Sequence, residues 1–178
     1  MPKNTKKVIK KDTEIIIKSL RQNSKENLDR LAARIGCSRQ KIWRIIKKLE
    51  EKTIWGYTIV FSREFLDMKR FIITIKLNAM PLDEPSRLEN IQKAISEDLE
   101  KQIKNVLLDC FFFVHGPYDI FMVISAKDIK DALRVRNFLY QKIGENIKDT
   151  RISEVLFNFV DGGIKNPQIK AFRDFYKK

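Results

Sequence analysis

Two short apolar stripes, separated by a three-residue turn, constrain the fold of this chain more than any other feature. Each stripe has four apolar residues at positions i, i+3, i+4 and i+7, the spacing that one face of an α-helix requires. The first stripe is Leu28, Leu31, Ala32 and Ile35, and the second is Ile42, Ile45, Ile46 and Leu49. Gly36 suits the left-handed end of the first helix, and Ser38 supplies an N-cap oxygen for the second. The pattern predicts helices over residues 27–35 and 39–52 that pack as a helix-turn-helix.

The neighbouring segments extend this motif to a winged helix-turn-helix domain over residues 12–61. A preceding helix is expected to start at a cap on Asp12 or Thr13 and to have an apolar side, formed by Ile15, Ile16 and Leu20. Residues 54–61 are rich in β-branched and aromatic side chains, with Gly56 near the start. This composition predicts a short wing strand.

From residue 71 onwards the pattern changes to strands alternating with helices. Strands are predicted over residues 71–79, 106–114, 119–125 and 151–160, and helices over residues 86–103 and 129–143. The order βαββαβ is that of a ferredoxin-like domain, so the predicted fold class is α+β. The predicted domain plan is a basic arm (1–11), the winged helix-turn-helix (12–61), a connector (62–70), a ferredoxin-like oligomerisation and effector domain (71–160) and a C-terminal tail (161–178). Residues 168–176 of this tail are expected to form a short helix or to remain a simple tail.

The two middle strands are apolar on both sides. Residues 110–114 read Cys-Phe-Phe-Phe-Val and residues 120–124 read Ile-Phe-Met-Val-Ile. In a βαββαβ fold the helices cover only one face of the sheet, and a sheet with one wet face should alternate apolar with polar residues. The second face therefore needs a cover. A second copy of the chain is the expected cover, giving a homodimer, and the chain's own tail is the alternative.

Positive charge is concentrated at the N-terminal end. The chain has 36 Lys and Arg against 23 Asp and Glu, a net charge of +13, and residues 1–60 hold 16 of these bases and 6 of the acids. Such a segment suits a polyanionic partner, of which nucleic acid is the commonest. A solvated surface that only keeps the protein in solution is the alternative.

The predicted helix over residues 39–52 has an outer face that suits a major groove. Gln can pair with adenine and Arg with guanine through two hydrogen bonds each, which assigns base reading to Gln40 and Arg44. Lysines on the same face and its flanks suit phosphates, as does the outward-facing N-terminus of the helix. The candidate DNA-binding residues are Ser38, Arg39, Gln40, Lys41, Arg44, Lys47 and Lys48. Trp43 is expected to pack against the wing near Trp55 rather than to read DNA.

Four segments in order resemble the Lrp/AsnC (leucine-responsive, feast/famine) transcriptional regulators. They are Leu31–Ser38, Lys47–Glu51, Ile54–Tyr57 ("I-x-G-Y") and Gly116–Asp119 ("G-x-Y-D"). The resemblance implies a C-terminal domain of the RAM type, sheet-to-sheet homodimers that assemble further, commonly to octamers, and control of promoters. It also implies an amino-acid effector near Gly116, Tyr118 and Asp119. The chain departs from the pattern at Thr53, where the family usually has Gly, and in its longer basic tail.

Other function classes find little support in the residues. Cys37 and Cys110 are 73 positions apart and His115 is the single histidine, so no zinc site or other cofactor is expected. Phosphate-binding glycine loops and nucleophile motifs are absent, which argues against an enzyme. No apolar run is long enough for a membrane span or signal peptide, so a reducing cytoplasm, on the nucleoid, is the expected location.

Two binding functions compete with a sequence-specific regulator. An architectural DNA-binding protein would share the fold but have little sequence preference and no effector. An RNA-binding protein would stack bases on sheet aromatics such as Phe111–Phe113. The location of the positive charge, on the helix or on the sheet, separates DNA binding from RNA binding. His115 is expected to be an ordinary residue at a strand end, with a pH-sensitive role as the alternative.

Overall fold

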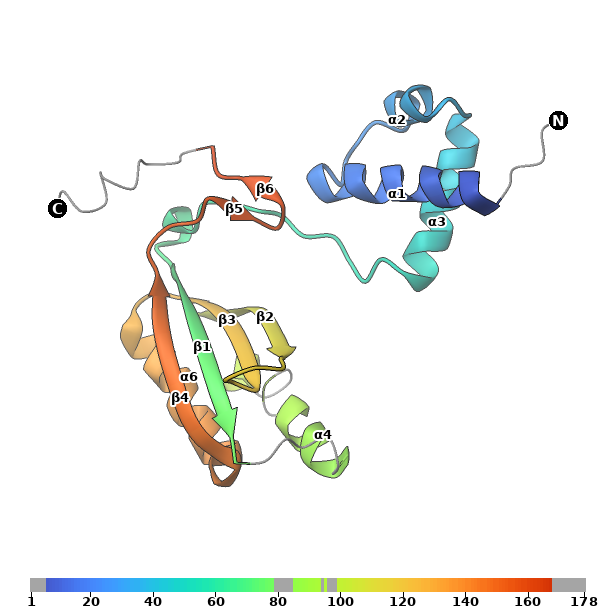
Figure 1. Cartoon of the computed structure of the whole chain (residues 1–178). Coiled ribbons are helices and arrows are strands. Elements are labelled where there is room, and N and C mark those ends of the chain that lie inside the picture. Colours follow the sequence, from blue (N-terminus) through green and yellow to red (C-terminus); the bar gives the residue numbers. More distant parts are fainter. Residues whose placement is uncertain (1–5, 79–84, 94, 96–98, 168–178) are drawn as a thin grey trace. The chain divides into compact units, whose positions relative to one another are not determined.

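The chain forms two compact units in the computed structural model, which describes residues 6–78, 85–93, 95 and 99–167. One unit comprises residues 1–60 together with 158–178, and the other comprises residues 61–157. The first contains helices and a small hairpin, and the second contains a four-stranded antiparallel sheet with helices (Figure 1). The predicted α+β class is confirmed.

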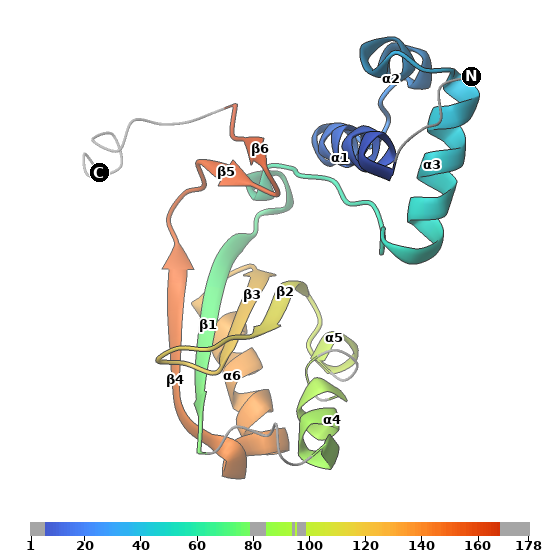
Figure 2. The same cartoon turned by 45° about the vertical axis from the view of Figure 1, so that its right-hand side comes forward.

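Within the described residues, three helices build the first unit around one small core. They are α1 (Lys6–Gln22), α2 (Leu28–Ile35) and α3 (Arg39–Lys52). The predicted ranges of α2 and α3 are confirmed to within one residue, and the apolar residues of both stripes are buried or partly buried in one core with α1. Figure 2 shows the three helices together. The buried core residues are Ile16, Leu31, Ala32, Ile42, Ile46 and Leu49.

The predicted start of the first helix is wrong. Residues 6–11 belong to α1 rather than to a separate basic arm, and residues 1–5 lie outside the described part of the chain. Lysine is a good helix former, and this stretch has no Gly or Pro to stop the helix. Asp12 consequently lies inside α1, where it is buried, instead of capping it.

The predicted wing strand is also not formed. Residues 54–62 have no regular secondary structure, and Trp55 is fully exposed. The first unit instead has a two-stranded hairpin near the C-terminus, β5 (Val160–Asp161) and β6 (Ile164–Lys165). Its turn is Gly162-Gly163, and both residues have positive φ (55° and 87°), as a tight two-residue hairpin turn requires. The short helix or tail expected at residues 168–176 lies outside the described residues.

The second unit has the predicted order βαββαβ. Its elements are β1 (Lys69–Leu77), α4 (Pro85–Lys93), α5 (Leu99–Gln102), β2 (Val106–Phe113), β3 (Ile120–Ala126), α6 (Ile129–Ile143) and β4 (Ile147–Val155). Short 3₁₀ turns precede β1 and follow α6, at Arg63–Leu66 and Gly144–Asn146. The strand order is β2-β3-β1-β4, with every pair antiparallel. The last strand starts four residues earlier than predicted, because Ile147 pairs with Leu77 at the far end of β1.

Helices cover one face of this sheet. Alternate residues of β1 and β3 point to that face, including Phe71, Ile73 and Ile75, and all three are fully buried. They share one core with Ile91 of α4 and Val135 of α6. The alternation of period two that defines a half-covered strand is therefore present in β1.

Candidate nucleic-acid interface

The turn between α2 and α3 is fixed by local hydrogen bonds. Gly36 has φ of 74°, and its N–H donates to the carbonyl oxygen of Ala32 at 2.9 Å. The N–H of Cys37 donates to the same oxygen at 3.0 Å. Ser38 then accepts a hydrogen bond at its Oγ from the N–H of Lys41 at 3.3 Å, capping α3. The left-handed Gly and the Ser cap together set the direction of α3 within three residues.

The outer face of α3 is polar and basic. Gln40, Arg44, Lys47 and Lys48 are all exposed and are spaced i, i+4, i+7 and i+8 along the helix. They lie opposite the buried stripe, because a helix turns through 360° in about 3.6 residues. The structure thus brings four of the predicted DNA-binding residues onto one accessible face. Ser38 and Arg39 are exposed at the N-terminal end of the same helix.

Lys41 differs from the other predicted DNA-binding residues because its side chain forms an ion pair within the domain. Its Nζ lies 2.6 Å from Oδ2 of Asp12 on α1, and the two side chains are only 29% and 10% exposed. The hydrogen bond from this ammonium to the carboxylate raises the pKa of Lys41. The pair joins α1 to α3, so Lys41 has a structural role that the helix pattern did not predict.

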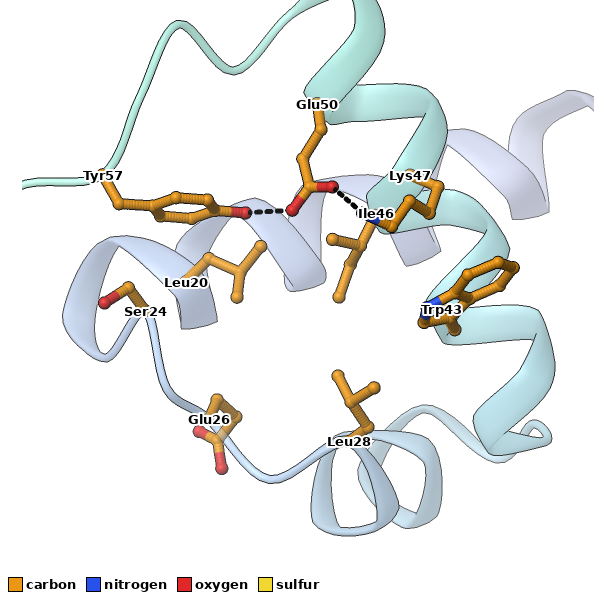
Figure 3. Close-up of a pocket in the computed structure, with 9 residues that line it drawn as sticks. All are labelled: Leu20, Ser24, Glu26, Leu28, Trp43, Ile46, Lys47, Glu50 and Tyr57. Carbon is orange, nitrogen blue, oxygen red and sulfur yellow. Dashed lines mark hydrogen bonds and ion pairs between the residues drawn. The ribbon is translucent and has the colours of Figure 1, made fainter.

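Two other bases of the interface have acidic neighbours at the surface. Nη1 of Arg39 lies 3.4 Å from Oδ2 of Asp29, with both side chains more than half exposed. Nζ of Lys47 lies 2.8 Å from Oε2 of Glu50, one turn along α3. The hydroxyl of Tyr57 donates to the other oxygen of Glu50 at 3.0 Å (Figure 3). The hydrogen bond from Lys47, followed by that from Tyr57, lowers the pKa of Glu50.

A shallow hollow of about 260 Å³ adjoins this network. Its lining comes from the end of α1, the start of α2, α3 and Tyr57, and consists of Leu20, Ser24, Glu26, Leu28, Trp43, Ile46, Lys47, Glu50 and Tyr57 (Figure 3). Trp43 stands on its rim and is 51% exposed. Since Trp55 is fully exposed, the predicted packing of these two tryptophans is wrong. Residue spacing gave no signal for this hollow, because three helices contribute to it.

Charge divides unequally between the two units. Residues 61–157 contain 15 Lys and Arg and 15 Asp and Glu, whereas residues 1–60 and 158–178 contain 21 and 8, so the whole net charge of +13 belongs to the first unit. The sheet unit is neutral. This distribution favours a nucleic-acid contact through α3 over one through the sheet.

The loop between β2 and β3 contains the three residues expected near an effector. Asp119 is 4% exposed, and its carboxylate accepts hydrogen bonds from the N–H of Leu77 (2.8 Å) and from Nζ of Lys76 (3.0 Å). Asp119 therefore fastens the loop to the end of β1. Gly116 is exposed, and the ring of Tyr118 has the guanidinium of Arg151 5.7 Å from its centroid. Of the three residues, only Gly116 and Tyr118 present accessible surface.

The sheet face without helices mixes apolar and polar side chains. Strand pairing places Phe112 beside Phe121, and Cys110 beside Val123. Phe112 is 50% exposed, and its ring lies 6.5 Å from that of Phe121. A polar group is on the same face: Oδ2 of Asp109 accepts from Oγ of Ser125 at 2.7 Å and lies 3.4 Å from Nε of Arg70. Phe111 and Phe113 pack against the helix-covered core instead.

The cysteines and acidic side chains do not form a metal site within the described residues. Among residues 6–78, 85–93, 95 and 99–167, no three His, Cys, Asp or Glu side chains gather as metal ligands would. Cys37 and Cys110 are both half-buried and form no disulfide with each other. Among the described helices, none combines the length and apolar character needed to cross a bilayer.

Comparison with solved structures identifies the fold. The chain is similar to an AsnC family transcriptional regulator from Agrobacterium tumefaciens (TM-score 0.64, 18% identity, 92% of this chain and 97% of that one). It is also similar to a Neisseria meningitidis transcriptional regulator solved with L-Met (0.64, 19%, 85% and 92%) and to AsnC of E. coli (0.55, 21%, 92% and 97%). No family model matches the sequence, and no curated protein matches it. The chain therefore has the fold of the AsnC/Lrp regulators.

Proposed function

We propose that this protein is a DNA-binding transcriptional regulator of the Lrp/AsnC type and not an enzyme. One observation carries the proposal: the exposed face of α3 presents Gln40, Arg44, Lys47 and Lys48 on the unit that holds all of the net charge. The likeness to AsnC regulators supports it. Such a protein would act on the nucleoid, in the cytoplasm.

In the proposed complex α3 lies in the major groove. Gln40 and Arg44 contact base edges, because their side chains carry the donor and acceptor patterns that distinguish adenine and guanine. Lys47 and Lys48 contact phosphates, and the N-terminal end of α3 with Ser38 and Arg39 contacts a further one. Lys41 is left out of this set, since its ammonium is already paired with Asp12.

A second copy of the chain is the proposed occupant of the open sheet face. The face exposes Phe112 and Leu107, which an isolated unit would leave in water. A symmetric dimer, or an assembly of dimers such as an octamer, would present two α3 helices. The target would then be roughly palindromic, with half-sites separated by about one or more helical turns.

An amino acid is the proposed effector, bound at the loop of residues 116–119. The Neisseria neighbour was solved with L-Met, which supports this class of ligand. In this chain the carboxylate of Asp119 is occupied by Lys76 and Leu77, so Gly116 and Tyr118 are the proposed contacts. A rise in melting temperature with one of the standard amino acids, absent in a Tyr118→Ala variant, would support the site.

The DNA-binding proposal is tested by fluorescence anisotropy at near-physiological salt. The duplexes are the region upstream of the protein's own gene and a shuffled sequence of the same composition. Arg44→Ala should cost about 1–3 kcal/mol on the specific duplex and much less on the shuffled one, whereas Lys48→Gln should weaken both similarly. Lys148→Gln, which changes an exposed lysine in the neutral unit, is the matched control and should change neither.

Other outcomes would select the competing functions. Tight binding that does not distinguish several promoter regions from shuffled DNA would favour an architectural DNA protein, because phosphate contacts carry no sequence information. Preference for single-stranded RNA would favour an RNA-binding protein. Two observations count against RNA: the sheet unit is neutral, and two of its three consecutive phenylalanines face the core.

A further inference from the structure

Glu50 is the one acidic side chain among those described that forms an ion pair with a lysine of the proposed phosphate-contacting set. Its Oε2 lies 2.8 Å from Nζ of Lys47, and both residues are on α3. Glu51, the next residue, is exposed on the same helix. Lys48 and Arg44, which share the exposed face with Lys47, form no ion pair with any residue in the described part of the chain. Lys47 therefore differs from the neighbouring bases Arg44 and Lys48 in having an acidic partner.

The carboxylate of Glu50 is held in place from a second side. The hydroxyl of Tyr57 donates to Oε1 at 3.0 Å, so the two oxygens of Glu50 serve two different partners (Figure 3). Tyr57 belongs to the segment that leaves α3, and its ring borders the hollow formed with Leu20 and Ile46. A carboxylate fixed by Tyr57 keeps its second oxygen directed towards Lys47. The Glu50–Lys47 pair is therefore more ordered than a single surface pair joined only by two flexible side chains.

We propose that Glu50 is a specificity-determining residue that withholds Lys47 from DNA phosphates; this proposal rests on the proposed DNA-binding function. Lys47 cannot make its best contact with both the carboxylate and a phosphate at once. At a matched site, the base contacts of Gln40 and Arg44 fix α3 in the groove and bring a phosphate to Lys47, which then exchanges partners. On unmatched DNA no contact fixes the helix, and the pair with Glu50 persists. Non-specific binding is thereby reduced more than specific binding.

This arrangement would account for an acidic side chain beside a DNA-binding surface. Affinity for any duplex depends on how many phosphates are neutralised, and each contact adds roughly 0.9 to the slope of log affinity against log salt. When one lysine is withheld on unmatched DNA, the slope is lowered by roughly 0.9, the contribution of one phosphate contact. The ratio of specific to non-specific affinity rises, although the absolute affinity falls.

A double-mutant cycle on the full-length protein tests the proposal. Wild type, Glu50→Gln, Lys47→Gln and the double variant are titrated on specific and shuffled duplexes at several salt concentrations. The glutamine side chain retains an oxygen that can accept from Tyr57, so Glu50→Gln removes the charge without removing the hydrogen bond. Glu51→Gln, alone and with Lys47→Gln, is the control for the general effect of losing one negative charge.

The expected result is an effect of Glu50→Gln that depends on Lys47. Affinity for the shuffled duplex should rise by roughly two- to fivefold, the range typical of an exposed ion pair, with a steeper salt slope and a smaller rise on the specific duplex. In the Lys47→Gln background the change should shrink to that of Glu51→Gln. Equal effects of Glu50→Gln in both backgrounds, or equal rises on both duplexes, would overturn the proposal. Absence of wild-type binding to any duplex would instead overturn the proposed function itself.

Discussion

The unit formed by residues 1–60 and 158–178 carries the net positive charge, whereas the unit formed by residues 61–157 has no net charge and exposes apolar side chains among the polar ones on its open sheet face. Among its described residues, the first has a small core of six buried apolar side chains around which bases are exposed. The second has nineteen buried apolar side chains in its core where the chain is described, with Phe112 and Leu107 exposed on the face that its helices leave open. The two surfaces suit different kinds of partner.

This difference has a thermodynamic consequence. Binding through the basic face of α3 should weaken steeply with salt, because it depends on releasing counterions from a polyanion. Association through the open sheet face should depend little on salt, since its main contribution is the removal of apolar surface from water. The contrast between the units is therefore measurable, and variants in each unit test it.

The largest effects are expected from cavities in the two cores. Ile42 and Ile73 are both completely buried, in the first and second unit respectively, and replacing either with Ala should cost about 2–5 kcal/mol of stability. Both tryptophans, Trp43 and Trp55, are in the first unit. Tryptophan fluorescence should therefore show a lower transition for Ile42→Ala only, whereas circular dichroism should detect both variants. A fluorescence transition lowered equally by Ile73→Ala would mean that the units unfold together.

The next largest effect is expected at the open sheet face. Phe112→Glu introduces a charge where a second copy is proposed to pack, and should weaken the dimer by about 2 kcal/mol or more if Phe112 is a central contact. Tyr140→Glu is the matched control, because Tyr140 is similarly exposed (42% against 50%) but belongs to α6. Sedimentation equilibrium should give monomers for Phe112→Glu and dimers for Tyr140→Glu. Dimers of unchanged strength for both would remove the sheet face from the interface.

An intermediate effect is expected from the pair that joins α1 to α3. Asp12→Asn leaves the ammonium of Lys41 without its carboxylate and should cost the first unit about 1–2 kcal/mol at neutral pH. The folded-state pKa of Lys41 is raised above 10.5, so the stabilisation is complete below that pH and is lost as the pH rises through the higher value. Urea unfolding followed by tryptophan fluorescence should show the two proteins converging in alkaline solution. A constant difference would mean that the charge of Lys41 is not involved.

The smallest effect is expected from Tyr57→Phe. Without the hydroxyl, Glu50 loses one of its two partners and holds Lys47 less firmly, so affinity for shuffled DNA should rise by roughly twofold or less. Anisotropy titrations against the shuffled duplex measure this change, with Tyr140→Phe on α6 of the neutral unit as a control. A decrease in affinity would indicate that Tyr57 itself contacts DNA.

Much of the fold followed from patterns within short stretches of sequence. The stripes of α2 and α3, with Gly36 and Ser38 between them, define a helix-turn-helix because helix periodicity and capping involve residues at most four or five positions apart. The order of strands and helices in the second unit followed from the same kind of local pattern. Four of the predicted DNA-binding side chains lie on one exposed face for this reason as well.

The remaining features depend on contacts between residues far apart in the sequence. Asp12 and Lys41 are 29 positions apart, and the hollow beside Trp43 is lined from three different helices, so no spacing rule joins these residues. The absent wing strand and the hairpin at residues 160–165 show the same limit, because a strand forms only where a partner strand accepts its hydrogen bonds. Asp119 shows the same limit of local patterns, because its carboxylate accepts a hydrogen bond from the N–H of Leu77, which is 42 positions away. Local sequence sets the helices and their faces, whereas long-range packing sets which charged and polar groups remain available for function.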